Sequence, residues 1–143
     1  MQIEWPKFLD TNIFIYAEDK DDLTKYQIAL DVIEERTKES DAVISMQVLA
    51  EFSSQMAGAM LPNEINDRIA DYQNSFQILS YSINEIRMAN EFFENYKIHF
   101  FDALIAATMK ANNIDTIITE NEDDFKRIPW LKVINPFKNP KKK

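Results

Sequence analysis

The 143-residue sequence predicts an α/β domain in which helices cover both faces of a central, mostly parallel sheet, a three-layer α/β/α arrangement. Short β-branched runs, such as residues 42–45 and 116–119, alternate with longer stretches of helical periodicity, such as residues 21–38 and 99–112. Such short apolar runs are typical of parallel strands that are buried on both faces. The length suits one hydrophobic core, since a domain of about 150 residues buries roughly 68–70% of its unfolded surface.

The first half of the chain contains two of the predicted strands. Its predicted elements are a strand at residues 8–9, a helical turn at 13–17, a helix at 21–38, a strand at 42–45 and a helix over 48–56. The first strand ends in Asp10-Thr11-Asn12, and the last helix carries Glu51. Ser45 precedes that helix and is a favoured N-cap residue.

The second half repeats the alternation. Its predicted elements are a helix from Pro62 to about Tyr72, a strand at 76–79, a helix from Ser82 through Tyr96, a helix at 99–112, a strand at 116–119 and a final apolar pair at 133–134. Ser82 lies three residues before Glu85, the spacing of a capping box. In parallel sheets, ligands bind outside the carboxyl ends of the strands, near a switch point in strand order.

The composition narrows the class of protein. There are no cysteines, which excludes disulfides and Cys-based zinc sites and fits a reducing compartment. No apolar run reaches the roughly 18 residues of a transmembrane helix, and the first ten residues lack the pattern of a secretion signal. We therefore expect a cytoplasmic protein without a membrane segment.

We expect residues 1–137 to form the domain and residues 138–143 to form a disordered basic tail, with a phosphate-binding arm as the alternative. The tail contains Lys138, Lys141, Lys142 and Lys143. The whole chain nevertheless carries a formal net charge of −8, which opposes simple binding to a phosphate backbone. A cation bound to the carboxylates would offset part of that charge.

Four acidic positions fall near the ends of the predicted strands or the starts of the predicted helices. Asp10 follows the first strand, Glu51 lies on the helix after the second, Asp102 lies in the first turn of the helix at 99–112, and an acidic run at 120–124 follows the strand at 116–119. A parallel sheet would bring these positions together, and converging carboxylates persist only where protons or cations offset their charge. Ligand sets made of oxygen atoms suit Mg²⁺ or Mn²⁺ rather than zinc or copper.

Each acidic residue also has a purely structural interpretation. Asp10 could cap the following helix, and Asp102 could complement the dipole of its own helix. Glu51 could belong to an exposed helix stripe, although an interior Glu is rarely found without a partner or a metal. The run at 120–124 could be a solvated loop. The combination of all four positions favours the functional interpretation.

Other catalytic designs are excluded or disfavoured. The absence of cysteine excludes a Cys–His pair, and the single histidine, His99, lies in no nucleophile-elbow sequence, so we expect it to have a structural or surface role. The single glycine, Gly58, excludes a P-loop and a dinucleotide fingerprint. The aromatic residues between 92 and 101 are interpreted as core or dimer interface rather than as a base-stacking platform.

The sequence resembles the PIN-domain family, which includes the VapC-type toxin ribonucleases. The resemblance covers nearly the whole chain and rests on three segments, FLDTNIFIYA, VISMQVLAEF and HFFDALIAATMKANNIDTIITENEDDF. It implies that Asp10, Glu51 and Asp102 are catalytic acidic residues. The fourth acidic position of the family, often Asp, is Asn121 here, which offers an oxygen but no charge.

The resemblance implies a metal-dependent endoribonuclease that cleaves RNA, the toxin of a type II toxin–antitoxin pair. Its implied metal ligands for Mg²⁺ or Mn²⁺ are Asp10, Glu51, Asp102, Asn121 and Asp124, with Glu120 as a neighbour of the fourth position; Thr11, Asn12 and Thr119 would orient ligands and water. A small antitoxin protein and a homodimer are the implied partners.

Two rival functions remain open at the level of sequence. The first is a catalytically weak or inactive PIN domain that binds RNA or protein, which Asn121 and the net negative charge favour. The second is a phosphotransfer domain with Asp10 as the nucleophile. The second is disfavoured because Asn12 stands where such phosphatases have a second Asp.

Overall fold

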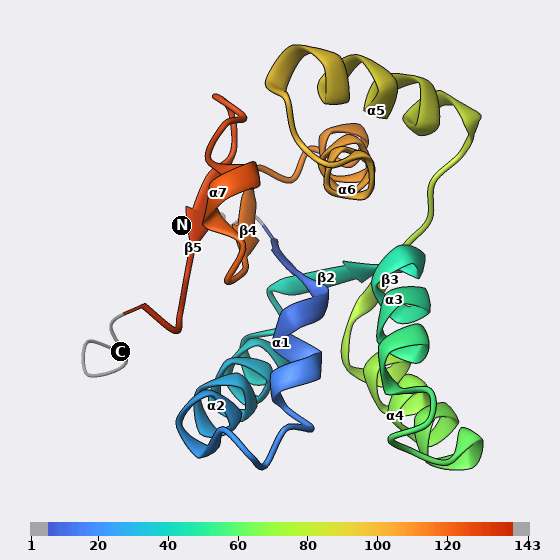
Figure 1. Ribbon diagram of the computed structural model, residues 1–143, viewed down its shortest axis with the longest axis vertical. Helices are drawn as coiled ribbons and strands as arrows, with labels where there is room; N and C mark the ends of the chain where they lie inside the picture. The colour runs from blue at the N-terminus through green and yellow to red at the C-terminus, as the bar shows by residue number, and fades with distance from the viewer. Residues whose placement is uncertain (1–5, 139–143) are drawn as a thin grey trace.

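The computed structural model describes residues 6–138 and contains a five-stranded parallel sheet (Figure 1). The strands are β1 (Lys7–Leu9), β2 (Ala42–Ser45), β3 (Gln77–Leu79), β4 (Thr116–Ile118) and β5 (Lys132–Ile134). They lie in the order β3-β2-β1-β4-β5, and every neighbouring pair is parallel. The predicted α/β class is therefore confirmed, and the sheet of the described residues is parallel throughout rather than mostly parallel.

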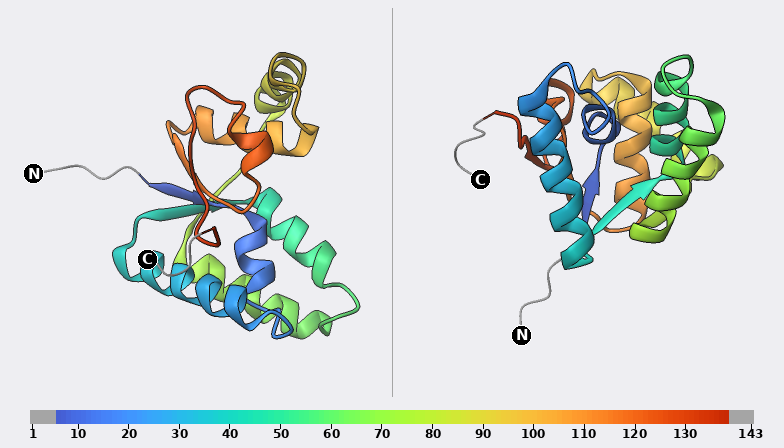
Figure 2. Two further views of the ribbon diagram at one scale, coloured as in Figure 1. Left: turned by 60° about the vertical axis from the view of Figure 1, so that its left-hand side comes forward. Right: turned by 90° about the horizontal axis from the view of Figure 1, so that it is seen from below.

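Helices cover both faces of this sheet. They are α1 (Thr11–Tyr16), α2 (Leu23–Glu39), α3 (Met46–Met56), α4 (Pro62–Ser75), α5 (Ile83–Tyr96), α6 (Phe100–Ala111) and α7 (Glu122–Phe125). Helices α1 to α4 lie on one side of the sheet, and α5 and α6 pack against each other on the other side (Figures 1 and 2). This is the predicted three-layer α/β/α arrangement.

The core lies between these layers, where the strands carry apolar side chains on both faces. Phe8, Ile44 and Ile117 come from three neighbouring strands, and all three are completely buried. Helix α6 is buried along most of its length because the run from Ala103 to Met109 faces the sheet on one side and α5 on the other. Burial on two sides explains why this helix is apolar nearly all round.

Local sequence signals fix several helix starts. Ser45 accepts a hydrogen bond from the backbone N–H of Val48, so the predicted N-cap of α3 is confirmed. Ser82 and Glu85 form the predicted capping box of α5. These caps satisfy backbone donors that the first turn of a helix leaves without partners.

Two local details differ from the sequence-based expectations. The acidic run at 120–124 is not simply a loop, because residues 122–125 form the short helix α7. The helical turn predicted at 13–17 begins earlier, at Thr11, because Asp10 caps it. Both differences lie at the carboxyl edge of the sheet.

In the described part of the chain, no helix is both long and apolar enough to cross a bilayer.

The strand order places a switch point at the centre of the sheet. From β1 the chain runs outward through β2 to β3, and then crosses back to β4 on the other side of β1. The carboxyl ends of β1 and β4 therefore lie side by side, with Leu9 paired to Ile118. Asp10 follows the first of these strands and Thr119 follows the second, at the position where parallel sheets bind ligands.

Candidate active site

Asp10 lies at the carboxyl end of β1 and is only 6% exposed. Its Oδ1 accepts a hydrogen bond from the backbone N–H of Thr11 (2.8 Å), so it caps α1. Its Oδ2 accepts hydrogen bonds from Thr119 Oγ1 (2.7 Å) and Asn12 Nδ2 (3.3 Å). The structural interpretation of Asp10 as a helix cap is thus correct, and the same contacts fix the carboxylate in one orientation.

Thr119 joins β1 to the loop that follows β4. Besides donating to Asp10, its hydroxyl oxygen accepts hydrogen bonds from Asn12 Nδ2 (3.0 Å) and from the backbone N–H of Asn121 (2.9 Å). Asn12 Oδ1 in turn accepts from the backbone N–H of Glu120 (3.2 Å). The polar residues that the sequence predicts to orient the site therefore form one network across the switch point.

Asp102 comes from the first turn of α6 and is half-buried. Its Oδ2 accepts a hydrogen bond from Asn121 Nδ2 (3.0 Å). Asn121 was expected to offer an oxygen ligand, but here it presents its amide nitrogen to Asp102. This contact stabilises the negative charge of Asp102.

Glu51 lies on the face of α3 that is turned toward the groove. It does not belong to an exposed stripe of the helix, the alternative that the sequence left open. It is half-buried and accepts a hydrogen bond from Gln47 Nε2 (2.8 Å), one turn earlier. The same nitrogen also donates to the backbone carbonyl of Phe101 (2.9 Å), at the start of α6. Gln47, a residue that the sequence analysis did not identify, therefore links α3 to α6 beside Glu51.

These side chains line one groove of about 330 Å³. Its lining residues are Asp10, Thr11, Asn12, Ile15, Tyr16, Glu51, Gln55, Asp102 and Asn121. The structure thus brings Asp10, Glu51 and Asp102 together, although the chain keeps them far apart. None of the lining residues is a lysine or an arginine, so no basic side chain of the groove offsets the three carboxylates.

The charge of the groove acts on the carboxyl groups themselves. Burial raises the pKa of Asp10 above its ordinary value. Burial, and then the nearby charge of Asp10, raises the pKa of Glu51. Burial, hydrogen bonding with Asp124 and the charge of Asp10 raise the pKa of Asp102. All three groups are thus held in an environment that disfavours their charged forms.

The donors present in the groove fit a hard divalent cation. The three carboxyl groups supply oxygen atoms, and the hydroxyl oxygen of Thr11 is buried without a hydrogen-bond partner in the described structure. Mg²⁺ and Mn²⁺ favour sets of oxygen ligands of this kind. A cation would also offset the charge of Asp10, which adds to burial in raising the pKa values of Glu51 and Asp102.

Asp124 has a different environment from the other candidate ligands. It is buried and accepts two hydrogen bonds from His99, one from the backbone N–H (3.1 Å) and one from ring Nδ1 (2.6 Å). Burial opposes ionisation, but hydrogen bonding with Asp102 and His99 outweighs it and lowers the pKa of Asp124. Asp124 is not among the residues that line the groove, and its carboxylate contacts His99 instead.

Glu120 is not among the residues that line the groove. Its carboxylate accepts hydrogen bonds from Tyr16 Oη and Lys25 Nζ, each at 2.5 Å. Lys25 also lies over the Tyr16 ring, 4.7 Å from its centroid. Of the predicted basic tail, the structure describes Lys138, whose Nζ lies 3.6 Å from Glu122 Oε2. Residues 139–143 lie outside the described part of the chain.

The sequence did not predict the contacts of His99 and Gln47, nor the positions of Ile15, Tyr16 and Gln55 in the groove lining. His99 is a surface residue as expected, with its side chain 87% exposed, but it also contacts the buried Asp124. The four-residue spacing of Gln47 and Glu51 on one helix could have indicated their contact. The sequence carries no comparable signal for His99 and Asp124, which lie 25 residues apart.

Comparison with known proteins agrees with this fold. The PIN domain family model matches residues 7–131, whereas the comparison with curated proteins gave no match. Among solved structures, VapBC2 from Rickettsia felis bound to a DNA fragment from their promoter shares 27% identity at a TM-score of 0.69; the match covers 90% of this chain and 97% of the other.

Two further solved structures share the fold at lower identity. A toxin–antitoxin complex from Klebsiella pneumoniae shares 22% identity over 91% of this chain and 97% of the other, at a TM-score of 0.66. Mycobacterium tuberculosis VapC20, described as a sarcin-ricin loop cleaving toxin, shares 16% identity over 81% of this chain and 90% of the other, at a TM-score of 0.62. With the family match over most of its length, the chain belongs to the PIN domain family.

Proposed function

We propose that this PIN domain is a metal-dependent endoribonuclease in which Asp10, Glu51 and Asp102 hold Mg²⁺ or Mn²⁺. The observation that carries the proposal is the convergence of three carboxylates, from β1, α3 and α6, on one groove without a basic side chain. Such a groove attracts divalent cations and repels a bare phosphate backbone. RNA binding therefore depends on the cation being present.

In this proposal the residues of the chain position the cation and its ligands for hydrolysis. When bound, Mg²⁺ or Mn²⁺ lowers the pKa of a coordinated water and offsets the charge that develops on the phosphate. Hydrogen bonds from Thr11 and Thr119 orient Asp10 to hold the cation, and a hydrogen bond from Asn121 orients Asp102. Attack by water in line with the leaving oxygen gives products with a 5′-phosphate and a 3′-hydroxyl.

The direct test compares RNA cleavage by the wild type, Asp10→Asn and Asp102→Asn in the presence of Mg²⁺ or Mn²⁺. We expect each variant to cut at least about 100-fold more slowly, because one charged group that acts on the transition state contributes about that much. EDTA should abolish wild-type cleavage.

Asp123→Asn is the matched control, because Asp123 lies on α7, is exposed and is absent from the groove lining. Circular dichroism would verify that all variants fold. Undiminished metal-dependent cleavage by both Asp10→Asn and Asp102→Asn would refute the assignment.

A catalytically weak PIN domain that binds RNA or protein is the second candidate. The orientation of Asn121 favours it, because its amide nitrogen rather than its oxygen faces Asp102. Titration calorimetry with Mn²⁺ separates the two candidates. The nuclease should bind Mn²⁺ through Asp10 and lose affinity in Asp10→Asn, whereas an inert fold should show no binding that depends on this carboxylate.

We further propose that the domain is the toxin of a toxin–antitoxin pair and acts in the cytoplasm. The support is its likeness to VapBC2 from Rickettsia felis and to other solved toxin–antitoxin complexes. A small antitoxin could place an arginine among the unpaired carboxylates of the groove. Expression of the wild type, but not of Asp10→Asn, should then arrest bacterial growth, and co-expression of a small protein encoded by a neighbouring gene should restore it.

A homodimer belongs to the same proposal. Of the aromatic residues proposed for the interface, Phe92, Tyr96 and Phe100 pack against the core, while Phe93 and Phe101 are exposed. The two exposed rings are therefore the ones free to contact a second copy. Light scattering should give the mass of a dimer, and Phe101→Glu should shift it toward the monomer if this surface is used.

A further inference from the structure

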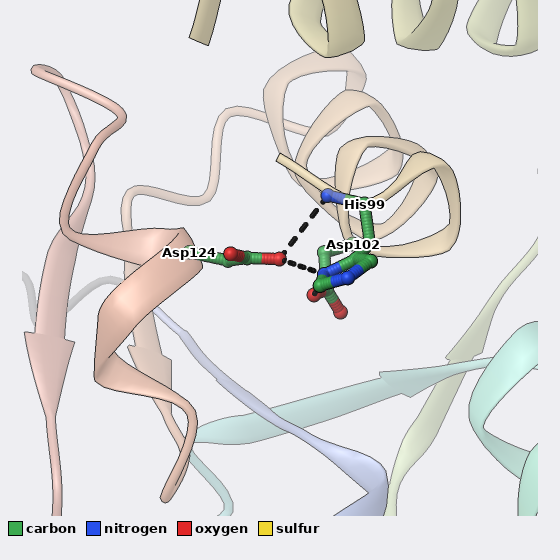
Figure 3. Close-up of side chains that lie close together, drawn as sticks. All are labelled: His99, Asp102 and Asp124. Carbon is green, nitrogen blue, oxygen red and sulfur yellow. Dashed lines mark hydrogen bonds and ion pairs between the residues drawn. The ribbon is translucent and has the colours of Figure 1, made fainter. Parts of the chain in front are cut away.

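A second group of ligand-type side chains lies beside the groove, at the start of α6. His99, Asp102 and Asp124 each offer one ligand atom, and these atoms all lie within 4.8 Å of one another. Figure 3 shows Asp124 pointing from α7 toward His99, whose ring lies next to Asp102. The three residues come from two elements, because α7 brings Asp124 against the first turn of α6.

The distances in this cluster suit a common ligand. His99 Nδ1 lies 2.6 Å from Asp124 Oδ2 and 4.0 Å from Asp102 Oδ2. Asp124 is buried, whereas the His99 side chain is exposed to solvent, from which an ion would arrive.

Asp102 belongs to both groups. On one side it lines the groove with Asp10, Glu51 and Asn121, which offer only oxygen atoms and an amide. On the other side it faces His99 and Asp124. The two groups therefore differ in chemistry, because only the second contains an imidazole.

We propose that His99, Asp102 and Asp124 form a second cation subsite that prefers a divalent transition ion such as Zn²⁺ to Mg²⁺. Imidazole nitrogen suits Zn²⁺ and its neighbours in the transition series, whereas Mg²⁺ selects oxygen ligands and keeps much of its water. His99 would bind such an ion through Nδ1 as neutral imidazole with its proton on Nε2, so binding to the imidazolium form releases one proton to solvent. The inference rests on the proposed function, since Asp102 is shared with the proposed Mg²⁺ site.

A purely structural role for the same contact makes different predictions. Asp124 accepts the backbone N–H of His99, the residue that precedes α6, and so ties α7 to the start of that helix. If this were the whole role of the cluster, replacing the His99 ring would change stability at most. Gln at position 99 keeps the backbone donor and an amide donor for Asp124 but removes the imidazole.

The experiment is titration calorimetry of the full chain with Zn²⁺ and, separately, with Mg²⁺. We expect His99→Gln and His99→Ala each to weaken Zn²⁺ binding at least about tenfold and to leave Mg²⁺ binding unchanged. Asp124→Asn should weaken Zn²⁺ binding by a similar factor. Asp10→Asn should show the reverse pattern, weakening Mg²⁺ binding more than Zn²⁺ binding. Asp123→Asn, which removes an exposed charge from the same short helix, is the matched control and should change neither.

The outcomes separate this inference from the proposed nuclease function. Equal Zn²⁺ affinity in the wild type and both His99 variants would overturn the second subsite, while loss of Mg²⁺ binding in Asp10→Asn would still support the first. Loss of Zn²⁺ affinity in Asp123→Asn as large as that in Asp124→Asn would also overturn it, because binding would then follow net charge. Zn²⁺ binding that depends on His99 would support the subsite even if the chain cut no RNA.

Discussion

At Thr119 a single hydroxyl, completely buried, connects three parts of the site. It donates to Asp10 and accepts from Asn12 and from the backbone of Asn121. A buried acceptor or donor that loses its partner costs about 1–3 kcal/mol. The orientation of Asp10 therefore depends on a residue from a different strand.

Replacing Thr119 with Val should remove these hydrogen bonds while keeping the volume of the side chain nearly constant. We expect cleavage to fall about 10–100-fold, the usual effect of losing a residue that orients a metal ligand. We also expect the free energy of unfolding to fall by about 1–3 kcal/mol. RNA cleavage assays and urea unfolding measure the two effects.

Thr116→Val is the matched control, because Thr116 lies at the start of the same strand and its hydroxyl contacts only the side chain of Asp115. It should leave cleavage unchanged. Full activity in Thr119→Val would contradict the proposed role of the hydroxyl.

Sequence alone could predict that Asp10, Glu51 and Asp102 converge on one groove. Asp10 follows a strand, Glu51 lies on the helix after a strand, Asp102 lies in the first turn of a helix, and parallel strands meet at one edge. It could not decide among Asn121, Glu120 and Asp124. That choice depends on partners distant in sequence: Lys25 holds Glu120, and His99 holds Asp124. Asp10 caps α1 through Oδ1, and its Oδ2 accepts from Thr119, so the helix cap is compatible with its position in the groove lining.

Helices and strands were predictable where their signals are local. The caps of α3 and α5 depend on residues three positions apart, and both are present as predicted. Helix α7 was not predictable, because four residues of an acidic run carry no periodicity. Its position depends on Phe125, which is completely buried.

Removing the cap of α5 gives a test at the level of one element. Ser82→Ala should lower the free energy of unfolding by about 0.5–2 kcal/mol, the usual cost of losing a side-chain cap. Because Ser82 lies outside the groove lining, Mg²⁺ affinity should stay the same. Urea unfolding and calorimetry measure the two quantities. If Ser82→Ala lost Mg²⁺ binding but not stability, Ser82 would act on the groove rather than as a helix cap.

The whole molecule combines a net charge of −8 with a sheet that gathers carboxylates at its centre. Composition predicted the charge and the α/β alternation predicted the layers, but the strand order was not readable from local patterns. That order decides which strand ends meet. The convergence of the carboxylates therefore follows from the strand order. Their mutual proximity should affect the stability of the entire fold.

The raised pKa values determine how the free energy of unfolding changes with pH. Asp10, Glu51 and Asp102 have pKa values above those of the unfolded chain, so the metal-free folded state holds more protons above about pH 4. The free energy of unfolding should fall as the pH rises from about 4 toward neutrality. The raised pKa of His99, caused by its hydrogen bond to Asp124, acts in the same direction.

Differential scanning calorimetry at pH 5 and pH 7.5, with EDTA or with Mg²⁺, measures this effect. With EDTA we expect a lower Tm at pH 7.5 than at pH 5, and Mg²⁺ should raise the Tm mainly at the higher pH. Asp102→Asn should be more stable than the wild type without metal at pH 7.5, by roughly 1 kcal/mol or more, since one pKa unit corresponds to about 1.4 kcal/mol. A Tm that rises with pH regardless of metal would contradict the account.

The most direct measurement is an anomalous difference map from crystals of this protein grown with Mn²⁺. We predict a peak in the groove, within about 2.5 Å of a carboxylate oxygen of Asp10 and of Asp102, the distance at which such cations hold oxygen ligands. Ordered Mn²⁺ at other positions with no peak between these two residues would contradict the claim that the carboxyl edge of the sheet is a cation site.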